Sequence, residues 1–275
     1  MEKRTDLAVE SFENANKTTI DGVKITEEND VTTVKVLNEK GARAIGKPIG
    51  KYVTYSVPSF VGDTDIFDGR LERVAEILSS LLPESFDSVL VAGIGNLDIT
   101  ADALGPKTNN YVLATRHIVS QNDKPKMFDG FVNVSSISTG VLGDTGIESA
   151  EIVKGVVNQI SPSCVIVVDA LAASSAQRLG TTVQLSDSGI SPGSGVGNHR
   201  FEISQKTLGV PVVSIGIPTV VSTALISNNR DDERLFVTPR EIDRVIEQGA
   251  KLIGMSINVC LQKNISPSDL FSLVG

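Results

Sequence analysis

The sequence predicts a three-layer α/β/α protein in which a mostly parallel sheet lies between two layers of helices. From about residue 88 onward, short apolar runs typical of buried strands alternate with segments whose apolar spacing is helical. Val, Ile, Ala and Gly dominate these runs and aromatic residues make up only 4% of the chain, a composition that suits a parallel sheet covered on both faces. The chain has 275 residues, of which 40% are hydrophobic, so it can bury a large core, and we expect a single domain over residues 1–275.

Residues 7–60 predict an N-terminal, β-rich accessory layer beside this sheet. Polar and apolar residues alternate over 31–36 and 52–57, as they do in half-buried strands. The segment 38–43 between them indicates a turn or a short helix. We therefore expect these strands to belong to an accessory layer.

The remainder of the chain supplies the helices and strands of the main sheet. Helical spacing of apolar residues predicts helices over 66–82, 106–120, 147–160 and 241–261. Apolar or alternating runs predict strands over 88–92, 131–137, 164–168, 181–185 and 211–217.

Charge and cysteine content restrict the classes of function and compartment. The formal net charge of −8, with no long basic run, disfavours direct binding to nucleic acid. The 2 cysteines form no disulfide framework. The first ten residues lack the apolar core of a signal peptide, so we expect a cytoplasmic protein.

The segment 207–229 carries no charge and is long enough to cross a bilayer. Gly209, Pro211, Gly216 and Pro218 interrupt it, however. A buried strand over 212–217, a turn at Pro218 and the start of a helix explain the segment better than a membrane span does. We expect no association with a membrane.

The first candidate site follows the strand over 88–92, where Gly93-Ile94-Gly95-Asn96 leads to Asp102. Open α/β sheets place their sites at the carboxyl ends of strands, which is where this turn lies. A dinucleotide site is disfavoured, because Asp98 stands where the third glycine of that fingerprint belongs. The alternative is a tight turn with solvated aspartates.

The second candidate site is Asp169, which comes directly after the apolar run Val165–Val168 and is followed by small residues. Such an aspartate serves either as a helix N-cap or as a functional group, and the two roles are compatible. If Asp102 and Asp169 lie at neighbouring strand ends, the two carboxylates cannot both ionise easily, and one of them holds a proton. The charged carboxylate can then activate water while the protonated one donates to a substrate carbonyl. Aspartic proteases share one proton between two aspartates in this way.

The third candidate site is the glycine-rich segment 186–200. Its glycines permit close approach of a backbone, so the loop could form an oxyanion hole or hold an extended peptide, the alternative being a plain surface loop. The residues we expect to contribute to substrate binding, in this loop and in the first turn, are Gly95, Asn96, Gly193, Ser194, Gly195, Gly197 and Asn198.

Taken together, these motifs resemble the bacterial germination protease family. The blocks that carry the resemblance span most of the chain: Arg4–Glu10, Thr100–Pro106, Thr115–His117, Thr145–Glu148, Val168–Ala173, Ser191–Asn198, Gly216–Val221 and Val237–Pro239.

The resemblance implies an aspartic-type endopeptidase that begins the degradation of small acid-soluble spore proteins when a spore germinates, with no cofactor. It places the catalytic aspartates at Asp102 and Asp169, and it implies a homotetramer made as a zymogen in the developing spore. The fold is expected to be related to that of hydrogenase maturation endopeptidases. The family's substrate pattern, Thr-acidic-apolar-Ala-x-Glu, matches Thr5–Glu10, so we expect self-cleavage between Asp6 and Leu7, with residues 1–6 as a short propeptide.

Two other functions remain open at this point. One is a metal-dependent endopeptidase of the hydrogenase maturation type, in which Asp102, Asp169 and His199 would bind nickel. His117 is expected to be a surface or packing residue, because on one continuous helix it would lie roughly 22 Å from Asp102. The other function is a paralogue that binds spore proteins without cutting them.

Overall fold

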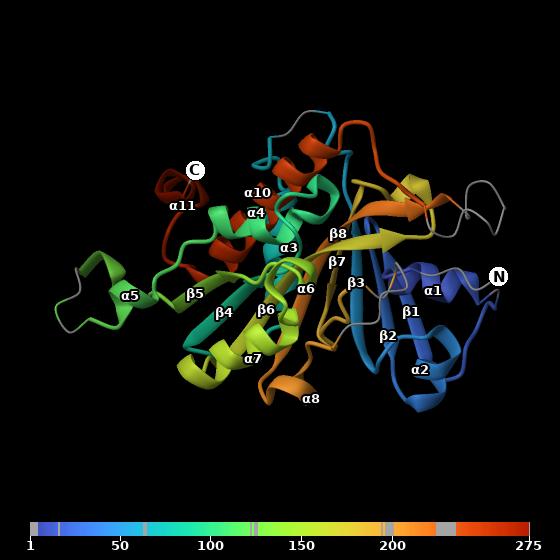
Figure 1. The fold of residues 1–275 in the computed structure, drawn as a ribbon, viewed down its shortest axis with the longest axis horizontal. Helices are drawn as coiled ribbons and strands as arrows, with labels where there is room; N and C mark the ends of the chain where they lie inside the picture. The colour runs from blue at the N-terminus through green and yellow to red at the C-terminus, as the bar shows by residue number, and fades with distance from the viewer. Residues whose placement is uncertain are drawn as a thin grey trace.

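The computed structural model describes residues 5–15, 17–62, 65–121, 123, 126–193, 195, 201–223 and 235–274 (Figure 1). The strands are β1 (Val23–Glu28), β2 (Val31–Val36), β3 (Gly50–Ser56), β4 (Ser88–Gly93), β5 (Asn133–Ser138), β6 (Cys164–Ala173), β7 (Thr182–Ser186), β8 (Val212–Ser222) and β9 (Phe236–Val237). The α-helices are α1 (Ala8–Asn14), α2 (Glu39–Ile45), α3 (Arg70–Ser79), α4 (Leu104–Thr108), α5 (Arg116–Val119), α6 (Leu142–Thr145), α7 (Ser149–Ile160), α8 (Gln205–Leu208), α10 (Ile242–Leu261) and α11 (Pro267–Val274). Short 3-10 helices are η1 (Thr100–Asp102), η2 (Asn109–Tyr111), η3 (Lys126–Phe128) and η4 (Ala176–Arg178).

All the strands belong to one 9-stranded mixed sheet with the order β1-β2-β3-β7-β8-β6-β4-β5, and β9 pairs with β8. The expectation of a mostly parallel sheet is wrong. Only the β5-β4-β6-β8 part is parallel, while β7 runs antiparallel to β8 and joins it to the antiparallel strands β3, β2 and β1. The alternation that identifies residues 181–185 as a strand carries no information on strand direction, which the sequence therefore left undetermined.

Helices pack on both faces of the parallel part (Figure 1). Side chains of β4 alternate between the faces: Val89 and Val91 join a core with helices α3 and α10, whereas Leu90 and Ala92 join a core with α7. The N-terminal strands carry a third cluster, in which Val34, Val36 and Tyr52 contact Leu7 and Val9 from the start of the chain. The alternation along β4 follows from the period of two in a strand, which points successive side chains to opposite faces of the sheet.

The helix expected over 106–120 is interrupted. Its helical turns are α4, η2 and α5, with a break after Tyr111. The side chain of Asn258 on α10 binds the chain at this break, accepting from Leu113 N at 2.8 Å and donating to Tyr111 O at 2.7 Å. Thr115 N donates to Val134 O at 2.9 Å, so backbone groups in this stretch bond to α10 and β5 instead of to a helical turn. His117 lies on α5 and is exposed, as expected for a surface residue.

The strand β8 continues through Pro218 to Ser222, so the expected turn and helix start at Pro218 are wrong. The register between β6 and β8 shifts between Leu171 and Ala172, opposite this proline. A proline lacks the N–H that a regular ladder needs and is tolerated at a bulge of this kind. The Pro218 carbonyl oxygen still accepts a hydrogen bond from Gly180 N at 3.0 Å. Within the described part of the chain, no helix is both long enough and apolar enough to cross a membrane.

Candidate active site

Three aspartates line one cavity of about 470 Å³ beside strands β6 and β8. They are Asp102, Asp169 and Asp6, and they reach the cavity from three segments that are distant in the sequence. Apolar side chains of Ile99 and Phe236 also line it. The two sequence-predicted catalytic residues therefore face a common space that a peptide could enter.

The turn after β4 places Asp102 at this cavity. Asp102 ends the 3-10 helix η1, and its carboxylate accepts a hydrogen bond from Asn96 N at 2.7 Å. Gly95 has a φ of +126°, and a Cβ at this position would overlap the main-chain oxygen of Asp102. A glycine is therefore required for the turn to close on Asp102. Asp98, by contrast, is exposed in the same turn.

Asp169 lies within β6 rather than at its end, because the strand continues to Ala173. The N-cap alternative for Asp169 is wrong, since no helix begins after it; the cap of the following 3-10 helix is Ser175. The Asp169 side chain is buried and accepts a hydrogen bond from Ala170 N at 2.9 Å. The residues after Asp169, Ala170 to Ala172, line the same cavity.

The N-terminal segment Thr5–Glu10 lies in this site. Asp6 pairs with Ala172 of β6 twice, through its main-chain N–H to Ala172 O at 2.8 Å and through its carboxylate from Ala172 N at 2.8 Å. Leu7 and Ala8 are fully buried. Leu7 is extended, with φ −80° and ψ 123°, and α1 begins only at Ala8. The bond predicted to be cut thus joins Asp6, which lies at a bend and lines the cavity of Asp102 and Asp169, to the extended residue Leu7.

Glu10 anchors the other end of this segment. Its side chain is buried and accepts hydrogen bonds from Ser174 N at 2.6 Å and Ser175 N at 3.0 Å, and from the hydroxyl of Thr5. The guanidinium of Arg178 lies 3.5 Å away. A buried carboxylate is stable only when it is paired and hydrogen-bonded, as it is here.

The glycine-rich loop contributes to the site where the structure describes it. Gly193 lines the cavity. Gly195 lies so close to the Asp6 carboxylate that a Cβ on Gly195 would overlap it. The other predicted members of this loop, Ser194, Gly197, Asn198 and His199, lie outside the described residues.

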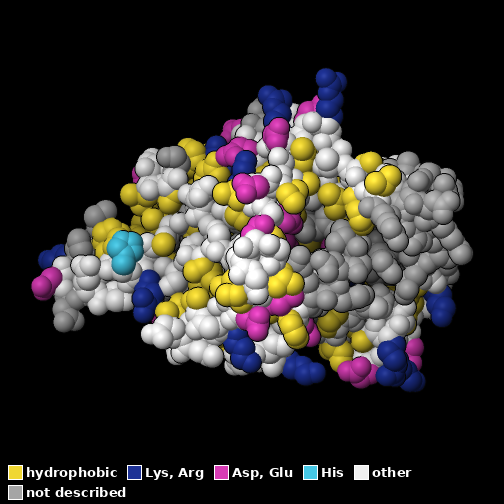
Figure 2. All heavy atoms as spheres, in the orientation of Figure 1, with side chains coloured by type: hydrophobic (Ala, Val, Ile, Leu, Met, Phe, Trp, Pro, Cys, Tyr) yellow, Lys and Arg dark blue, Asp and Glu magenta, His cyan; other side chains and the backbone are white. Residues whose placement is uncertain are grey.

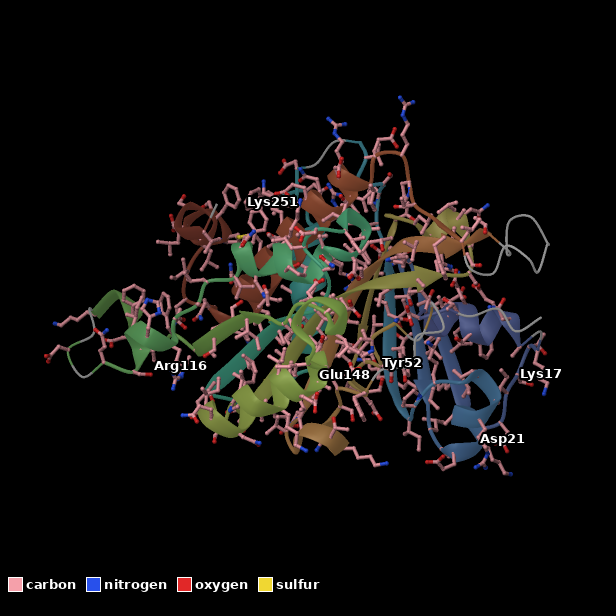
Figure 3. All side chains as sticks on the ribbon, viewed as in Figure 1. Lys17, Asp21, Tyr52, Arg116, Glu148 and Lys251 are labelled. Carbon is pink, nitrogen blue, oxygen red and sulfur yellow. The ribbon has the colours of Figure 1, made fainter. Side chains whose placement is uncertain are left out.

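A second cavity, of about 240 Å³, shares lining residues with the first. Asp6 and Leu171 line both cavities, and Lys47, Gln184 and Tyr52 line the second. Tyr52, labelled in Figure 3, comes from β3 in the antiparallel part of the sheet. Asp6 of the N-terminal segment and Leu171 of β6 are thus common to the walls of both cavities.

Lys47 binds the main chain of this segment. Its ammonium group donates to Thr5 O at 2.8 Å. Burial lowers the pKa of Lys47 below its ordinary value, and the charges of Asp6 and Glu10 act in the opposite direction. The amine thus binds the main chain just before the predicted cleavage point.

Sequence reasoning missed Gln184, Lys47 and Arg178, which hold the segment from β7, from the loop between α2 and β3, and from η4. Gln184 stands at a polar position of the alternating run 181–185, on the opposite face from Val183 and Leu185, so the alternation does not single it out. Lys47 and Arg178 have no distinguishing pattern.

No group of three or more His, Cys, Asp and Glu side chains suited to a metal ion exists among the described residues. The histidine of the proposed nickel set, His199, is outside them.

Comparisons with known proteins agree with one another. The family model described as "Germination protease" matches residues 2–233. The chain is 38% identical to a germination protease of Clostridium perfringens, over 97% of each protein. It is 39% identical to that of Caldanaerobacter subterraneus subsp. tengcongensis, over 98% of each. It is 42% identical to that of Priestia megaterium, over 97% of this chain and 76% of the relative.

Among solved structures, a NiFe hydrogenase maturation protease, HycI from Thermococcus kodakarensis KOD1, aligns with 66% of this chain and 99% of its own. The sequence identity is 20% and the TM-score is 0.40.

Proposed function

The chain belongs to the germination protease family, and on that premise we propose that it is an endopeptidase that begins the degradation of small acid-soluble spore proteins during germination. The observation that carries the proposal is the cavity shared by Asp102 and Asp169, which Asp6 of the chain's own N-terminal segment also lines. Hydrolysis by an aspartate pair requires a peptide bond beside two carboxylates, and the Asp6–Leu7 bond adjoins the residue that lines their cavity.

In the proposed reaction, one of the two aspartates is ionised and accepts a proton from water, whose oxygen adds to the carbonyl carbon. The other aspartate carries a proton and donates it toward the carbonyl oxygen. The C–N bond then breaks and the leaving nitrogen takes up a proton. Two interacting carboxyl groups titrate as a pair, so the acid and base roles belong to Asp102 and Asp169 together.

We propose further that the chain is a zymogen that cuts itself between Asp6 and Leu7. Two observations support this proposal. Asp6 lines the cavity of the two aspartates, and Leu7, which follows it, has an extended main chain. Release of residues 1–6 would remove Asp6, which lines both cavities. The space beside Asp102 and Asp169 would then be available to a second peptide.

The proposed setting is the spore core, with the protein as a homotetramer, as the family resemblance implies. Spore proteins are the proposed partners rather than nucleic acid. On the face drawn in Figure 2, the coloured Lys and Arg side chains are scattered near the edges and interspersed with acidic ones. The net charge of −8 likewise disfavours direct binding to nucleic acid.

Mass spectrometry of cleavage products tests this proposal. The purified chain is incubated with a small acid-soluble spore protein at neutral and mildly acidic pH, beside Asp102→Asn and Asp169→Asn variants. Asp98→Asn is the matched control, because Asp98 is exposed in the same turn as Asp102. We expect the wild type and the control to cut before an apolar residue in the pattern of Thr5–Glu10, and both active-site variants to be inactive.

An arm with EDTA addresses the metal-dependent alternative. Unchanged cleavage in EDTA supports the aspartate pair, whereas loss of cleavage that is restored by nickel would replace it with the metal mechanism. A wild-type chain that binds the spore protein at every pH tested but never cuts it would contradict the enzymatic proposal and support a binding role.

A further inference from the structure

Gln184, on β7, binds the main chain on both sides of Leu7. Its side-chain nitrogen donates to the main-chain oxygen of Asp6 at 3.0 Å. Its side-chain oxygen accepts from Ala8 N at 2.7 Å. The carbonyl that Gln184 contacts is the one that water must attack if the chain cuts itself between Asp6 and Leu7.

The sheet fixes the position of this amide. Gln184 pairs with Thr54 of β3 on one side and with Gly216 of β8 on the other, so its main chain lies in the interior of the sheet. Its side chain is only 8% exposed. A buried amide costs free energy unless its donor and acceptor are both paired, and the segment 6–8 supplies a partner for each. Gln184 is thus held at one place along the peptide before any reaction begins.

The aspartates and the amide face Asp6 from different cavities. Asp102 and Asp169 line the larger cavity, and Gln184 lines the smaller one, while Asp6 lines both. A water nucleophile adds to a carbonyl carbon from one face, whereas a donor that stabilises the oxyanion lies toward the oxygen. Groups that line two different cavities beside Asp6 are compatible with those two tasks.

We propose that Gln184 is a catalytic residue, which donates a hydrogen bond to the carbonyl oxygen of the peptide bond that is cut. As the water oxygen bonds to this carbon, negative charge develops on the oxygen, and the fixed N–H group of Gln184 stabilises it. The amide neither gains nor loses a proton; one aspartate accepts a proton from the water, and the C–N bond to the next residue breaks as its nitrogen takes up a proton from the aspartate pair. The inference rests on the proposed function, and it extends to spore proteins bound in the same place.

A docking role is the competing explanation, because Gln184 also holds the N-terminal segment through Ala8 N. Gln184→Glu separates the two roles. An ionised glutamate keeps the length of the side chain and the acceptor for Ala8 N–H but cannot donate to the Asp6 oxygen. Gln184→Met removes both hydrogen bonds at similar volume. Gln177→Glu is the matched control, since Gln177 is exposed on η4, outside both cavities.

The experiment follows two cleavages in the full chain of each variant. Intact-mass measurements give the first-order rate at which residues 1–6 are released. A synthetic peptide that spans residues 1–14 gives kcat and KM for cleavage in trans, and thermal unfolding checks that each variant is folded. Hydrogen exchange of the amides in Leu7–Asn14 reports whether the segment stays docked.

We expect Gln184→Glu and Gln184→Met to lower kcat by about 100-fold, the usual effect of losing one oxyanion donor, with KM changed far less. The rate of release should fall by a similar factor, and Gln177→Glu should match the wild type. If Gln184→Glu and Gln184→Met alter hydrogen exchange or KM but leave kcat within threefold of the wild type, Gln184 only docks the segment and the inference is wrong.

Failure of the proposed function gives a different pattern. If Asp102→Asn and Asp169→Asn still cut while Gln184→Glu does not, the aspartate pair is wrong and the role of Gln184 stands. If the wild type releases no residues and cuts no peptide, both proposals are wrong.

Discussion

Gly95 shows how one residue can decide the geometry of the site. Its positive φ turns the chain after β4, and the missing side chain lets the main chain of Asp102 approach. The carboxylate of Asp102 then accepts from Asn96 N. The sequence identified Gly95 and Asn96 as members of a turn, but their contact with Asp102 depends on a fold that brings residues 95 and 102 together.

A Gly95→Ala substitution should therefore displace Asp102 and lower activity by more than tenfold. A positive φ costs a non-glycine residue roughly 1–2 kcal/mol, and the overlap with Asp102 adds to that cost. Gly69→Ala is the matched control, because Gly69 has a φ of +100° but no atom within 4 Å of the new Cβ. Cleavage assays and denaturant unfolding of both variants measure the effect; equal losses of activity in the two would contradict the role assigned to the contact with Asp102.

At the scale of elements, the N-terminal segment is attached to the sheet by its two ends. Asp6 pairs with β6, and Glu10, the third residue of α1, accepts from the turn that follows β6. The Glu10 carboxylate is buried, whereas that of Glu13, which also contacts Arg178, is 53% exposed. The two glutamates on one short helix thus differ mainly in burial.

Glu10→Ala should release this segment and lower the free energy of unfolding by about 2 kcal/mol, because buried N–H donors lose a charged acceptor. Glu13→Ala should cost less than about 1 kcal/mol, as exposed ion pairs do. Denaturant unfolding gives both values, and hydrogen exchange of Leu7–Asn14 shows whether α1 has detached. A Glu10→Ala variant that is as stable as Glu13→Ala, with α1 still protected, would rule out Glu10 as the anchor.

The pattern of apolar residues located most strands of the sheet, including β2, β4, β6 and β7. It did not show that β6 and β8 extend past Asp169 and Pro218, because the small residues and proline there also fit a turn. It also missed the break after Tyr111, which depends on Asn258 from a helix more than a hundred residues away. Local patterns fail where a distant side chain satisfies the backbone.

At the scale of the whole molecule, two buried free thiols make the stability of the fold depend on pH. Cys164 lies on β6 and Cys260 on α10, and both are buried. Burial raises the pKa of Cys164 to about 12 and that of Cys260 to about 11. In the unfolded chain both thiols ionise near the ordinary value of 9.0.

Stability should therefore fall as the pH rises above about 9, because the unfolded chain releases protons that the folded protein retains. Each thiol contributes a slope of at most about 1.4 kcal/mol per pH unit, over pH 9 to 12 for Cys164 and 9 to 11 for Cys260. Denaturant unfolding between pH 8 and 11 of the wild type and of Cys164→Ala measures the slope. The variant should lose less stability with pH than the wild type; identical slopes would mean that Cys164 is not shielded from water in the folded state.

The sequence by itself determined the α/β class, the positions of most strands and the candidate residues Asp102 and Asp169, because apolar periodicity and short motifs are local properties of the chain. Asp6 and Leu7 were predicted from the resemblance to the family's substrate pattern. The blocks that resemble germination proteases predicted the family, and the comparisons show that the chain belongs to it. Only the tertiary structure decided the direction of β7 and β8, the cavity that Asp6 shares with the two aspartates, and the contacts of Gln184 and Glu10. These depend on how distant segments pair, and no spacing along the chain encodes which carbonyl a buried amide will meet.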